Sequence, residues 1–346
     1  MAAKSIKLSD DNVTFYTLPG SSGEIANEAG LLPDTVFGQN FESNFPGLID
    51  WTISADAIFK GFAGYVVGLK ITGTPTGMTA EACSLVSGKT YEITDTTKRI
   101  LNRSSSPALD ILDNGVSVAA ANIESIDYLF GQVTFVAGYT PTTPITMTGE
   151  YLPATEIAGA KTFTLTQTAN PIDESTIPIV KANDGRRVYS YGLKTVSLDI
   201  SGVYASSNGF LANLLSRNEF ILEINPDNSD LAVARGFFRF TTQGQSGNVG
   251  ELEEETLAFT LSVPDDDKAA APFSWNIEGA STISPAIAIA IASWQDGTPI
   301  YVQYLPDGLT GVTGDVIITD LSLAGGLESM NTFTVNMQGS DALTTV

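Results

Sequence analysis

Most of the chain alternates polar and hydrophobic residues with a period of two. The alternating runs are rich in Thr, Val, Ile, Phe and Tyr, and they include residues 13–17, 132–136, 161–166, 196–200 and 332–337. This period is typical of β-strands that bury one face, because successive side chains of a strand point to opposite sides. Turn-forming Asn, Asp, Gly and Pro separate the runs, as at residues 113–115, 183–185, 226–228 and 306–308. The pattern predicts a mainly β protein.

Three segments carry a helical pattern instead. Residues 206–217 place apolar side chains at helical spacing. Residues 284–294 begin with Ser284 and Pro285, which suit the N-cap and the first helical position, although the Ala-Ile alternation that follows also fits a strand. Residues 57–65 form a weaker third candidate. We therefore expect few and short helices.

The second half of the chain contains an internal repeat. Residues 196–202 (Val-Ser-Leu-Asp-Ile-Ser-Gly) align with residues 273–279 (Phe-Ser-Trp-Asn-Ile-Glu-Gly). Each is followed by a predicted helix, a strand ending in Pro-Asp, a strand opened by Gly, a loop with Gly and Glu, and a closing strand. These later strands cover residues 220–227, 236–240 and 257–261 in one copy and 300–307, 314–318 and 332–335 in the other. The preserved order indicates a duplicated domain, since a solenoid would need more copies at a shorter period.

The repeat and the segments around it suggest five parts. Residues 49–56 resemble the first repeat strand a third time, so the N-terminal part is expected to complete the C-terminal copy. Residues around 83–151 differ in pattern, because their strand-like runs are short and lie near 89–93, 108–115, 128–135 and 145–151. This pattern predicts an inserted small β-module. The expected division is 1–82 for the N-terminal strands and loop, 83–155 for the module, 156–264 for copy one, 265–272 for a linker and 273–346 for copy two.

The amino-acid composition excludes several classes of catalytic, metal and nucleic-acid site. The chain has 346 residues, 43% of them hydrophobic, with no histidine, one cysteine (Cys83) and a net charge of -22. Without histidine, zinc sites built from Cys and His and Ser-His-Asp arrangements are excluded. The acidic balance opposes nucleic-acid binding, which needs clustered Lys and Arg. The first residues lack a signal-peptide pattern, and the longest apolar run, residues 285–293, is too short to span a bilayer. We expect a cytoplasmic product without cofactors.

Few residues suggest catalysis or ligand binding. A glycosidase would need a carboxylate pair, for which the candidates are Asp95, Asp110, Asp113 and Glu124, but acidic residues at strand ends are common in this chain. Residues 265–267 are three aspartates without the ligand spacing or turn glycine of a calcium loop. The tryptophans Trp51, Trp275 and Trp294 suit a core better than a sugar platform. We therefore expect no enzymatic activity and no metal site.

The order of elements in the repeat resembles that of the major tail tube proteins of long, non-contractile-tailed bacteriophages (siphophages). Residues 90–95, 126–135 and 148–152 also resemble a module found in tail proteins of such phages. The resemblance implies a duplicated tail-tube fold, in which two packed β-sheets are flanked by a short helix, plus the inserted module. In that family the sheets of neighbouring subunits join into a β-barrel ring, and rings stack around a channel for DNA. A terminator or baseplate-hub relative would show the same pattern.

The resemblance also implies the partners and the location. The chain would assemble with itself, as a trimer of duplicated folds in preference to a hexamer, and with tape-measure, tail-tip and terminator proteins. DNA would pass through the lumen without specific binding, no membrane would be involved, and the product would be part of a virion tail assembled in the host cytoplasm. The alternative function is a β-sandwich decoration or receptor-binding protein of a virion.

Candidate contacts between rings or with the lumen lie in two predicted loops and one hairpin tip. The loops are residues 18–45 and 243–255, and long loops of this kind are usually functional. The alternatives are a solvated hairpin tip for the two arginines and a solvated loop for the acidic run 251–255. The candidate residues are Glu24, Glu28, Asp34, Glu42, Arg186, Arg187, Glu251, Glu253, Glu254 and Glu255.

Overall fold

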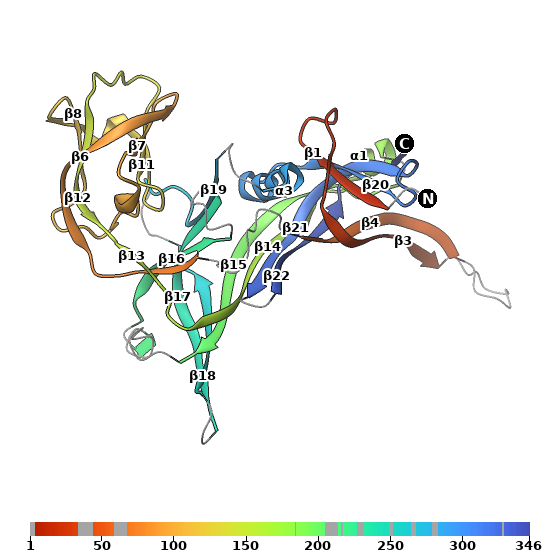
Figure 1. Ribbon diagram of the computed structural model, residues 1–346. Helices are drawn as coiled ribbons and strands as arrows, with labels where there is room; N and C mark the ends of the chain where they lie inside the picture. The colour runs from red at the N-terminus through yellow and green to blue at the C-terminus, as the bar shows by residue number, and fades with distance from the viewer. Residues whose placement is uncertain are drawn as a thin grey trace. The chain divides into compact units, whose positions relative to one another are not determined.

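The computed structural model shows a chain that divides into two compact units (Figure 1). The first comprises Met1–Tyr65, Thr162–Leu198 and Ala280–Val346, and the second comprises Val66–Lys161 and Asp199–Gly279. The structure describes residues 4–33, 44–58, 68–183, 185–204, 214–215, 217–226, 232–248, 252–263, 268–278, 283–326 and 329–346. The described strand pairs are antiparallel and belong to two sheets. The protein is therefore mainly β with few short helices, as its sequence predicts.

The described residues of the first unit form strands of very different lengths and two helices. Its elements are β1 (Ser5–Ser9), β2 (Tyr16–Thr17), β3 (Gly20–Pro33), β4 (Asn44–Ile58), α1 (Ile177–Ala182), α3 (Pro285–Asp296), β20 (Ile300–Leu305), β21 (Val312–Gly326), β22 (Ser329–Gly339) and β23 (Thr344–Thr345). It also contains most of β14 (Ala160–Asp173) and of β15 (Tyr189–Val203), whose remaining residues belong to the second unit.

A sheet with the strand order β3, β4, β22, β21, β14, β15 forms the body of the first unit (Figure 1). Its buried face follows from the two-residue alternation of the sequence. One row of opposed residues on this face runs across β4, β22, β21 and β14, through Ala55, Val335, Leu321 and Gln167, and all four are at most 1% exposed. Burying alternate side chains of β4, β22, β21 and β14 in this way fixes their register, because a one-residue slip would reverse both faces.

Helix α3 covers part of the buried face. It begins after Ser284 with Pro285 in its first turn, and it ends at Gly297, whose φ of 72° is the left-handed conformation common at helix C-termini. Trp294 is 3% exposed. The hydroxyl of Tyr191 on β15 lies 2.9 Å from that of Ser293 on α3. The helix predicted for residues 284–294 is confirmed.

The structure contradicts the described start of one of the other two predicted helices and describes only a few residues of the second. Ala57 and Ile58, the predicted start of a helix over residues 57–65, are the last two residues of strand β4, so the prediction is wrong there. Its remaining residues lie outside the described part of the chain. The physical reason is that Ala57 is buried opposite Phe333 on β22, and this sheet pairing outweighs local propensity. Of the helix predicted for residues 206–217, only 214, 215 and 217 are described, and 214 and 215 are helical.

The second unit contains a smaller set of similar strands and the inserted module. Its elements are β5 (Gly68–Thr72), β6 (Thr76–Ser87), β7 (Thr90–Ile93), η1 (Thr96–Lys98), β8 (Asp110–Asp113), β9 (Val116–Ser117), η2 (Ala120–Asn122), β10 (Ile123–Asp127), β11 (Gln132–Phe135), β12 (Ile145–Tyr151), β13 (Ala154–Glu156), β16 (Glu219–Asn225), β17 (Ala232–Ser246), β18 (Glu254–Leu261) and β19 (Phe273–Ile277). Among the described helices of both units, none is long and apolar enough to cross a lipid bilayer.

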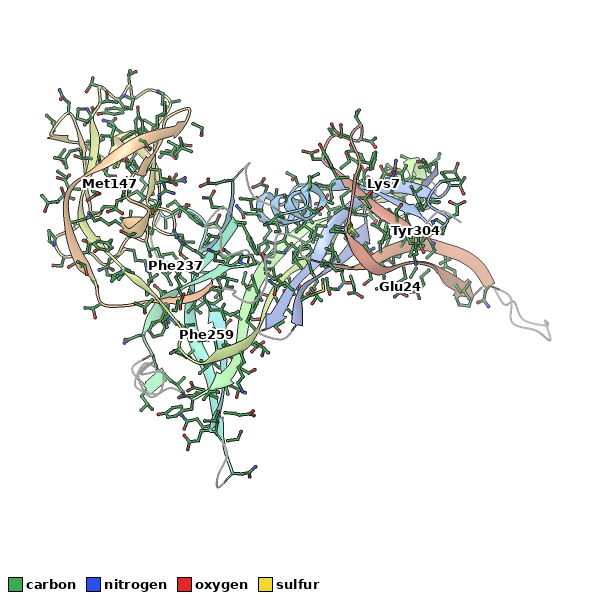
Figure 2. All side chains as sticks on the ribbon, viewed as in Figure 1. Lys7, Glu24, Met147, Phe237, Phe259 and Tyr304 are labelled. Carbon is green, nitrogen blue, oxygen red and sulfur yellow. The ribbon has the colours of Figure 1, made fainter. Side chains whose placement is uncertain are left out.

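The module is a sheet of its own, with the strand order β10, β11, β7, β6, β12, β8, β9. Its core includes Met147, which is fully buried and labelled in Figure 2. The same hydrophobic cluster includes Ile221 on β16 and Phe237 on β17, so the module packs on these strands. A hydrogen bond reinforces the contact, since Arg235 Nη1 donates to the backbone carbonyl oxygen of Leu129 at 2.8 Å.

Two hairpins, one in each unit, have the same internal register. In β17–β18, Phe238 pairs with Leu261 and a bulge follows between Phe240 and Thr242. In β21–β22, Val316 pairs with Gly339 and a bulge follows between Ile318 and Asp320. The partner strands match as well, since β16 pairs with the first half of β17 and β20 with the first half of β21. The bulge is thus at the same distance from the start of both pairings.

The outer strands follow the same scheme. Strand β5 pairs with β16 as β1 pairs with β20. After β1, the chain passes through β2 into the long hairpin β3–β4. After β5 and the module, it passes through β13 into the long hairpin β14–β15. The module lies between β5 and β13, whereas a short connection joins β1 to β2 in the first unit. Strand β4 borders β22, so the N-terminal residues complete a sheet that the C-terminal residues begin.

Candidate functional site: a polar sheet face and its edge strands

The face of the first unit's sheet that is not buried carries rows of small polar side chains. One row consists of residues that lie opposite one another on successive strands: Glu24, Ser54, Asn336, Asp320 and Thr168. A hydroxyl–hydroxyl contact of 2.6 Å continues this row from Thr168 to Thr195 on β15. Because residues directly opposite in a sheet point to the same side, these side chains share one surface.

A second row runs parallel to the first. It contains Ser22, Asp56, Thr334, Ser322 and Thr166 on β3, β4, β22, β21 and β14. Its members are joined by hydrogen bonds, since Ser22 Oγ donates to Asp56 at 2.7 Å and Thr334 Oγ1 to the same carboxylate at 2.9 Å. We call the residues of the two rows the polar face.

The charges of the polar face all have one sign. Its ionisable members are Glu24, Asp56 and Asp320, and neither row contains Lys or Arg. Burial raises the pKa of Asp320. Apolar side chains on the same side of these strands include Ile172, Leu193 and Met330, which are 51%, 82% and 63% exposed. The polar face therefore offers hydroxyl, amide and carboxylate groups but no cation to hold a phosphate.

The sheet joins strands from the two parts of the chain that the sequence predicts to be copies. Strand β14, inside predicted copy one, pairs with β21, inside predicted copy two, from Thr162 opposite Gly326 to Thr168 opposite Asp320. On the buried side of this junction, Phe163 is 3% exposed and Leu165 is fully buried. Phe163 lies opposite Gly325, where a Cβ atom would be 2.7 Å from the phenylalanine ring. The glycine therefore makes room for the aromatic side chain.

The predicted loop over residues 18–45 is wrong for most of its length. Residues Gly20–Pro33 form strand β3 and Phe45 lies in strand β4, while residues 34–43 lie outside the described part of the chain. The prediction failed because β3 does not alternate in hydrophobicity. Most of its described side chains are exposed on both faces, and Leu31 and Leu32 are 66% and 60% exposed.

The acidic candidates on the β3–β4 hairpin are exposed. Glu24, labelled in Figure 2, lies opposite Ser54, and Glu28 lies opposite Asp50. The pair of Glu28 and Asp50 brings two carboxylates to neighbouring positions. Arg187 Nε lies 3.5 Å from Asp50 and offsets this repulsion. Asp34 and Glu42 lie outside the described residues.

The two candidate arginines belong to the end of the β14–β15 hairpin, which contacts β4. Arg186 forms an isolated parallel bridge with Ile49, and the backbone N–H of Arg187 donates to Ile49 O at 3.2 Å. The side chain of Arg187 also pairs with Asp173 at 3.1 Å. Arg187 thus makes ion pairs inside its own chain, on both its own hairpin and β4.

The acidic run of the second loop is partly a strand. Glu254 and Glu255 belong to β18, and residues 243–246 belong to β17, so the loop predicted over 243–255 is wrong at both ends. Glu255 is 4% exposed and accepts a hydrogen bond from Gln243 Nε2, which corrects the expectation of a solvated loop for this residue. Glu253 O accepts a hydrogen bond from Tyr204 N at 2.9 Å. Glu251 lies outside the described residues.

The carboxylates considered for glycoside hydrolysis are held by their own loops. Asp113 accepts hydrogen bonds from Tyr139 and Thr142, and although burial acts to raise its pKa, these bonds lower it overall. The pKa of Asp95 is also lowered, by hydrogen bonds from Thr97. A general acid needs a raised pKa, so neither residue suits that role. Within the described ranges, no group of three or more Cys, Asp or Glu residues is placed to hold a metal ion.

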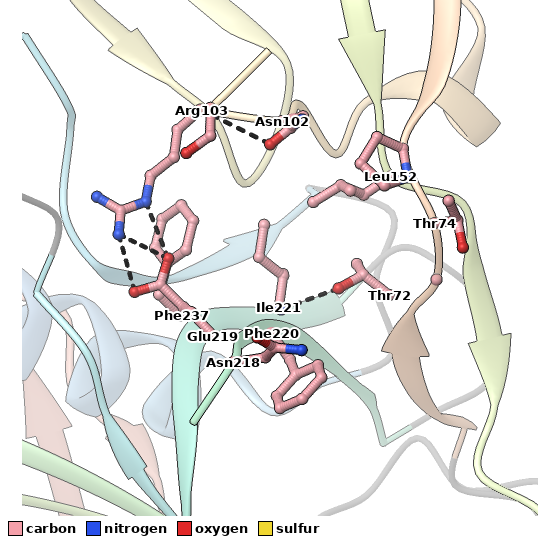
Figure 3. A pocket seen from close by; sticks show the side chains of 13 residues that line it. Thr72, Thr74, Asn102, Arg103, Leu152, Asn218, Glu219, Phe220, Ile221 and Phe237 are labelled. Carbon is pink, nitrogen blue, oxygen red and sulfur yellow. Dashed lines mark hydrogen bonds and ion pairs between the residues drawn. The ribbon is translucent and has the colours of Figure 1, made fainter. Parts of the chain in front are cut away.

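A cavity of about 580 Å³ lies in the second unit beside the connections to the module (Figure 3). Its lining includes Arg103, Glu219 and Phe237. Arg103 pairs with Glu219 through two hydrogen bonds of 2.9 Å and lies over the ring of Phe237 at 5.4 Å. The opposite charges satisfy each other, so the cavity presents no unpaired charged group from this pair. The three tryptophans are buried at 1–5% exposure, which confirms their predicted place in the core.

Comparisons with known proteins give limited matches. No protein-family model and no curated protein matches the chain. The solved structures that match part of it include two from gene transfer agent particles. The tail of an empty GTA particle with C6 symmetry matches with 16% identity and a TM-score of 0.29, over 36% of this chain and 87% of that chain. The virion of a native gene transfer agent particle matches with 15% identity and a TM-score of 0.30, over 36% and 88% of the two chains.

Proposed function

We propose that this chain is the structural subunit of a phage-like tail tube, which polymerises into stacked rings around a channel for DNA. The observation that carries the proposal is the polar face, a broad sheet surface of hydroxyl, amide and carboxylate groups without a cation in its rows. A channel for DNA must repel phosphates weakly everywhere and bind them nowhere, and such a surface does both.

The second support is the recurrence of one fold within the chain. The matched registers of β17–β18 and β21–β22, with a bulge at the same place, support a duplicated domain. The proposed division keeps 156–264 as copy one and 265–272 as the linker, and the strands through β4 complete copy two. It differs from the sequence-based bounds at three places: β5 pairs with β16 of copy one, the module begins with β6, and β19, at the start of 273–346, pairs with β17 of copy one. The junction between β14 and β21 then links the two copies edge to edge.

Edge-to-edge linkage within one chain favours a ring of three chains. Three duplicated chains supply six copies of the fold, and a closed ring leaves no sheet edge exposed. Partners at the ends of such a tube would be tape-measure, tail-tip and terminator proteins, and the assembled product would belong to a virion tail. The acidic candidates Glu24 and Glu28 would face the channel or an adjacent ring.

The test combines assembly with a charge change on the polar face. Negative-stain electron microscopy of concentrated protein should show rings or tubes with a stain-filled hole. Thr166→Lys combined with Ser322→Lys should still assemble, because both side chains are on the unburied face, but the tubes should retain DNA in a filter-binding assay. Val116→Lys, at a module position that is 70% exposed, is the matched control and should not retain DNA.

Two results would count against the proposal. A chain that remains monomeric at high concentration and with tail proteins added would favour the decoration or receptor-binding alternative. Tubes that assemble but gain no DNA retention from the double lysine variant would show that the polar face does not line the channel.

A further inference from the structure

Strand β3 is the described edge of the first unit's sheet, and the other copy shows what such a strand does when it has a partner. In the described part of the chain β3 pairs with β4 alone. Its counterpart β14 has a neighbour on each side, β15 and β21. A long strand with an open row of backbone N–H and C=O groups is a template for pairing with another chain.

The residues of β3 and β14 can be matched one to one. In the sequence alignment of residues 49–56 with 196–203, the preceding residue Leu48 corresponds to Thr195. Thr195 contacts Thr168 across the β14–β15 hairpin, and Gly30 lies against Leu48 across the β3–β4 hairpin. Gly30 therefore corresponds to Thr168, and Glu24 corresponds to Thr162.

The partner of β14 has a counterpart too. The shared bulge matches Asp320 on β21 with Thr242 on β17 and therefore Gly325 with Gly247. Along this edge of β21, β20 pairs as far as Val316 and β14 continues from Asp320. Along the same edge of β17, β16 pairs as far as Arg239, and no described strand pairs beyond it.

We propose that β3 of one chain adds to β17 of a second copy of this chain, antiparallel, with Glu24 opposite Asn248 and Gly30 opposite Thr242. This inference rests on the proposed ring, and it specifies which edges close it and in which register. Each chain then offers one β3 edge and one β17 edge, so the contact is head-to-tail and closes into a ring by rotation.

The side chains at the proposed contact support this register. Phe163, Leu165 and Gln167 are at most 3% exposed in the β14–β21 junction, whereas their counterparts on β3 are Ile25, Asn27 and Ala29, which are half-buried or exposed. These three positions are thus unburied in the single chain and become buried in the ring.

Both β21, which pairs with β14, and β17, which would pair with β3 of a second copy, carry a glycine at the matching position. Gly325 makes room for Phe163, and a Cβ atom there would lie 1.9 Å from Asn331 Oδ1. Its counterpart Gly247 would receive Ile25. The atom nearest to a Cβ on Gly247 belongs to Glu253, the counterpart of Asn331. The pocket for the incoming side chain is therefore formed by matching residues in the two copies.

Cysteine cross-linking tests the register. In a Cys83→Ser background, Ala26→Cys and Ser246→Cys are predicted to be opposite each other, and oxidation of assembled rings should give covalent oligomers on non-reducing gels that end at the trimer. The control pairs Ala26→Cys with Gln245→Cys, whose side chain points to the other face of the strand, and should not cross-link.

A charge at the buried side of the contact gives an independent readout. Ala29→Lys changes an exposed residue in the single chain, so its far-UV circular dichroism and unfolding midpoint should match the wild type, but rings should be lost. Thr52→Lys, exposed on β4, is the matched control and should leave rings intact.

The outcomes separate this inference from the function. Rings that form without the predicted cross-link, or that cross-link equally in the control pair, or that tolerate Ala29→Lys, would overturn the strand assignment and leave the tube proposal standing. Failure of the wild-type chain to form rings under any condition would overturn both.

Discussion

Glu223 is the residue whose removal should most weaken the second unit. It lies on β16, 3% exposed, opposite Lys70 on β5 and Arg235 on β17. Lys70 Nζ is 2.7 Å from one carboxylate oxygen, and Arg235 approaches the other at 2.7 and 2.8 Å. Arg235 in turn donates to Leu129 O in the module, so Glu223 positions the side chain that ties the module to the sheet.

Glu223→Gln should lower the free energy of unfolding by about 3 kcal/mol. Removing one partner of a buried ion pair typically costs about 3–5 kcal/mol, because the remaining charge stays buried without compensation. We expect the lower end because the side chain of Lys70 is 28% exposed and can regain water, and because glutamine still accepts a hydrogen bond. Glu81→Gln is the matched control: its partner Lys98 keeps Asp95 at 3.3 Å, and the loss should stay below about 1 kcal/mol.

Urea unfolding followed by tryptophan emission is the assay. Trp275 is 5% exposed and lies opposite Ala234, the neighbour of Arg235, so it reports on this part of the sheet. A loss for Glu223→Gln no larger than that of the control would refute the reasoning. So would a triple variant of Lys70, Glu223 and Arg235 to apolar residues that is as unstable as Glu223→Gln, because replacing a whole buried network is often close to neutral.

The pH dependence of the free energy of unfolding tests the same stabilisation by the ionised Glu223 side chain. Burial alone would raise the pKa of Glu223, but the charges of Arg235 and Lys70 outweigh it and lower the pKa below the ordinary value of 4.5. A group with a lowered folded-state pKa adds stability above its unfolded pKa and loses it as the pH falls through the folded value. The difference between wild type and Glu223→Gln should thus be constant from about pH 7 to 5 and shrink below about pH 4.5.

Three further predictions concern the packing of two buried sites and the reactivity of the thiol. Trp51→Ala should cost about 3–5 kcal/mol of unfolding free energy, because the ring is 1% exposed and its Nε1 donates to Asp341 O at 2.8 Å; circular dichroism under denaturant measures this. Gly325→Ala should cost about 1–3 kcal/mol through overpacking at the β14–β21 junction, while Gly77→Ala, where a Cβ meets nothing within 4 Å, should cost less than about 1 kcal/mol. Cys83, whose pKa burial and the charge of Glu81 raise to about 12, should react with a disulfide reagent at pH 8 orders of magnitude more slowly in the folded than in the unfolded protein, and equal rates would contradict this.

The sequence predicts best those strands that bury one face in the chain itself. Residues 332–337 alternate because Phe333, Val335 and Met337 all face the core, and their alternation marked β22 correctly. The start of the helix over 284–294 was also predictable, since Ser284 and Pro285 mark its N-terminus. In these cases local pattern and tertiary burial agree.

The sequence predicts poorly those strands whose burial depends on something else. Strand β3 reads as a loop because most of its described side chains are exposed in the single chain, and an alternating pattern arises only from burial of one face. The polar face was equally hidden, because Ser, Thr, Asn and Gln positions such as Ser54 and Asn336 look alike on any solvated strand. Only the register, which opposes Ser54 to Asn336 and Asn336 to Asp320, gathers them on one surface.

The most direct test of the tube proposal is a cryo-electron microscopy reconstruction of the assembled protein at side-chain resolution. The proposal predicts rings of three chains whose channel wall is formed by the polar face, with Ser54, Asp56 and Asp320 pointing into the lumen. Rings in which these side chains face outward, or particles without a central channel, would contradict it.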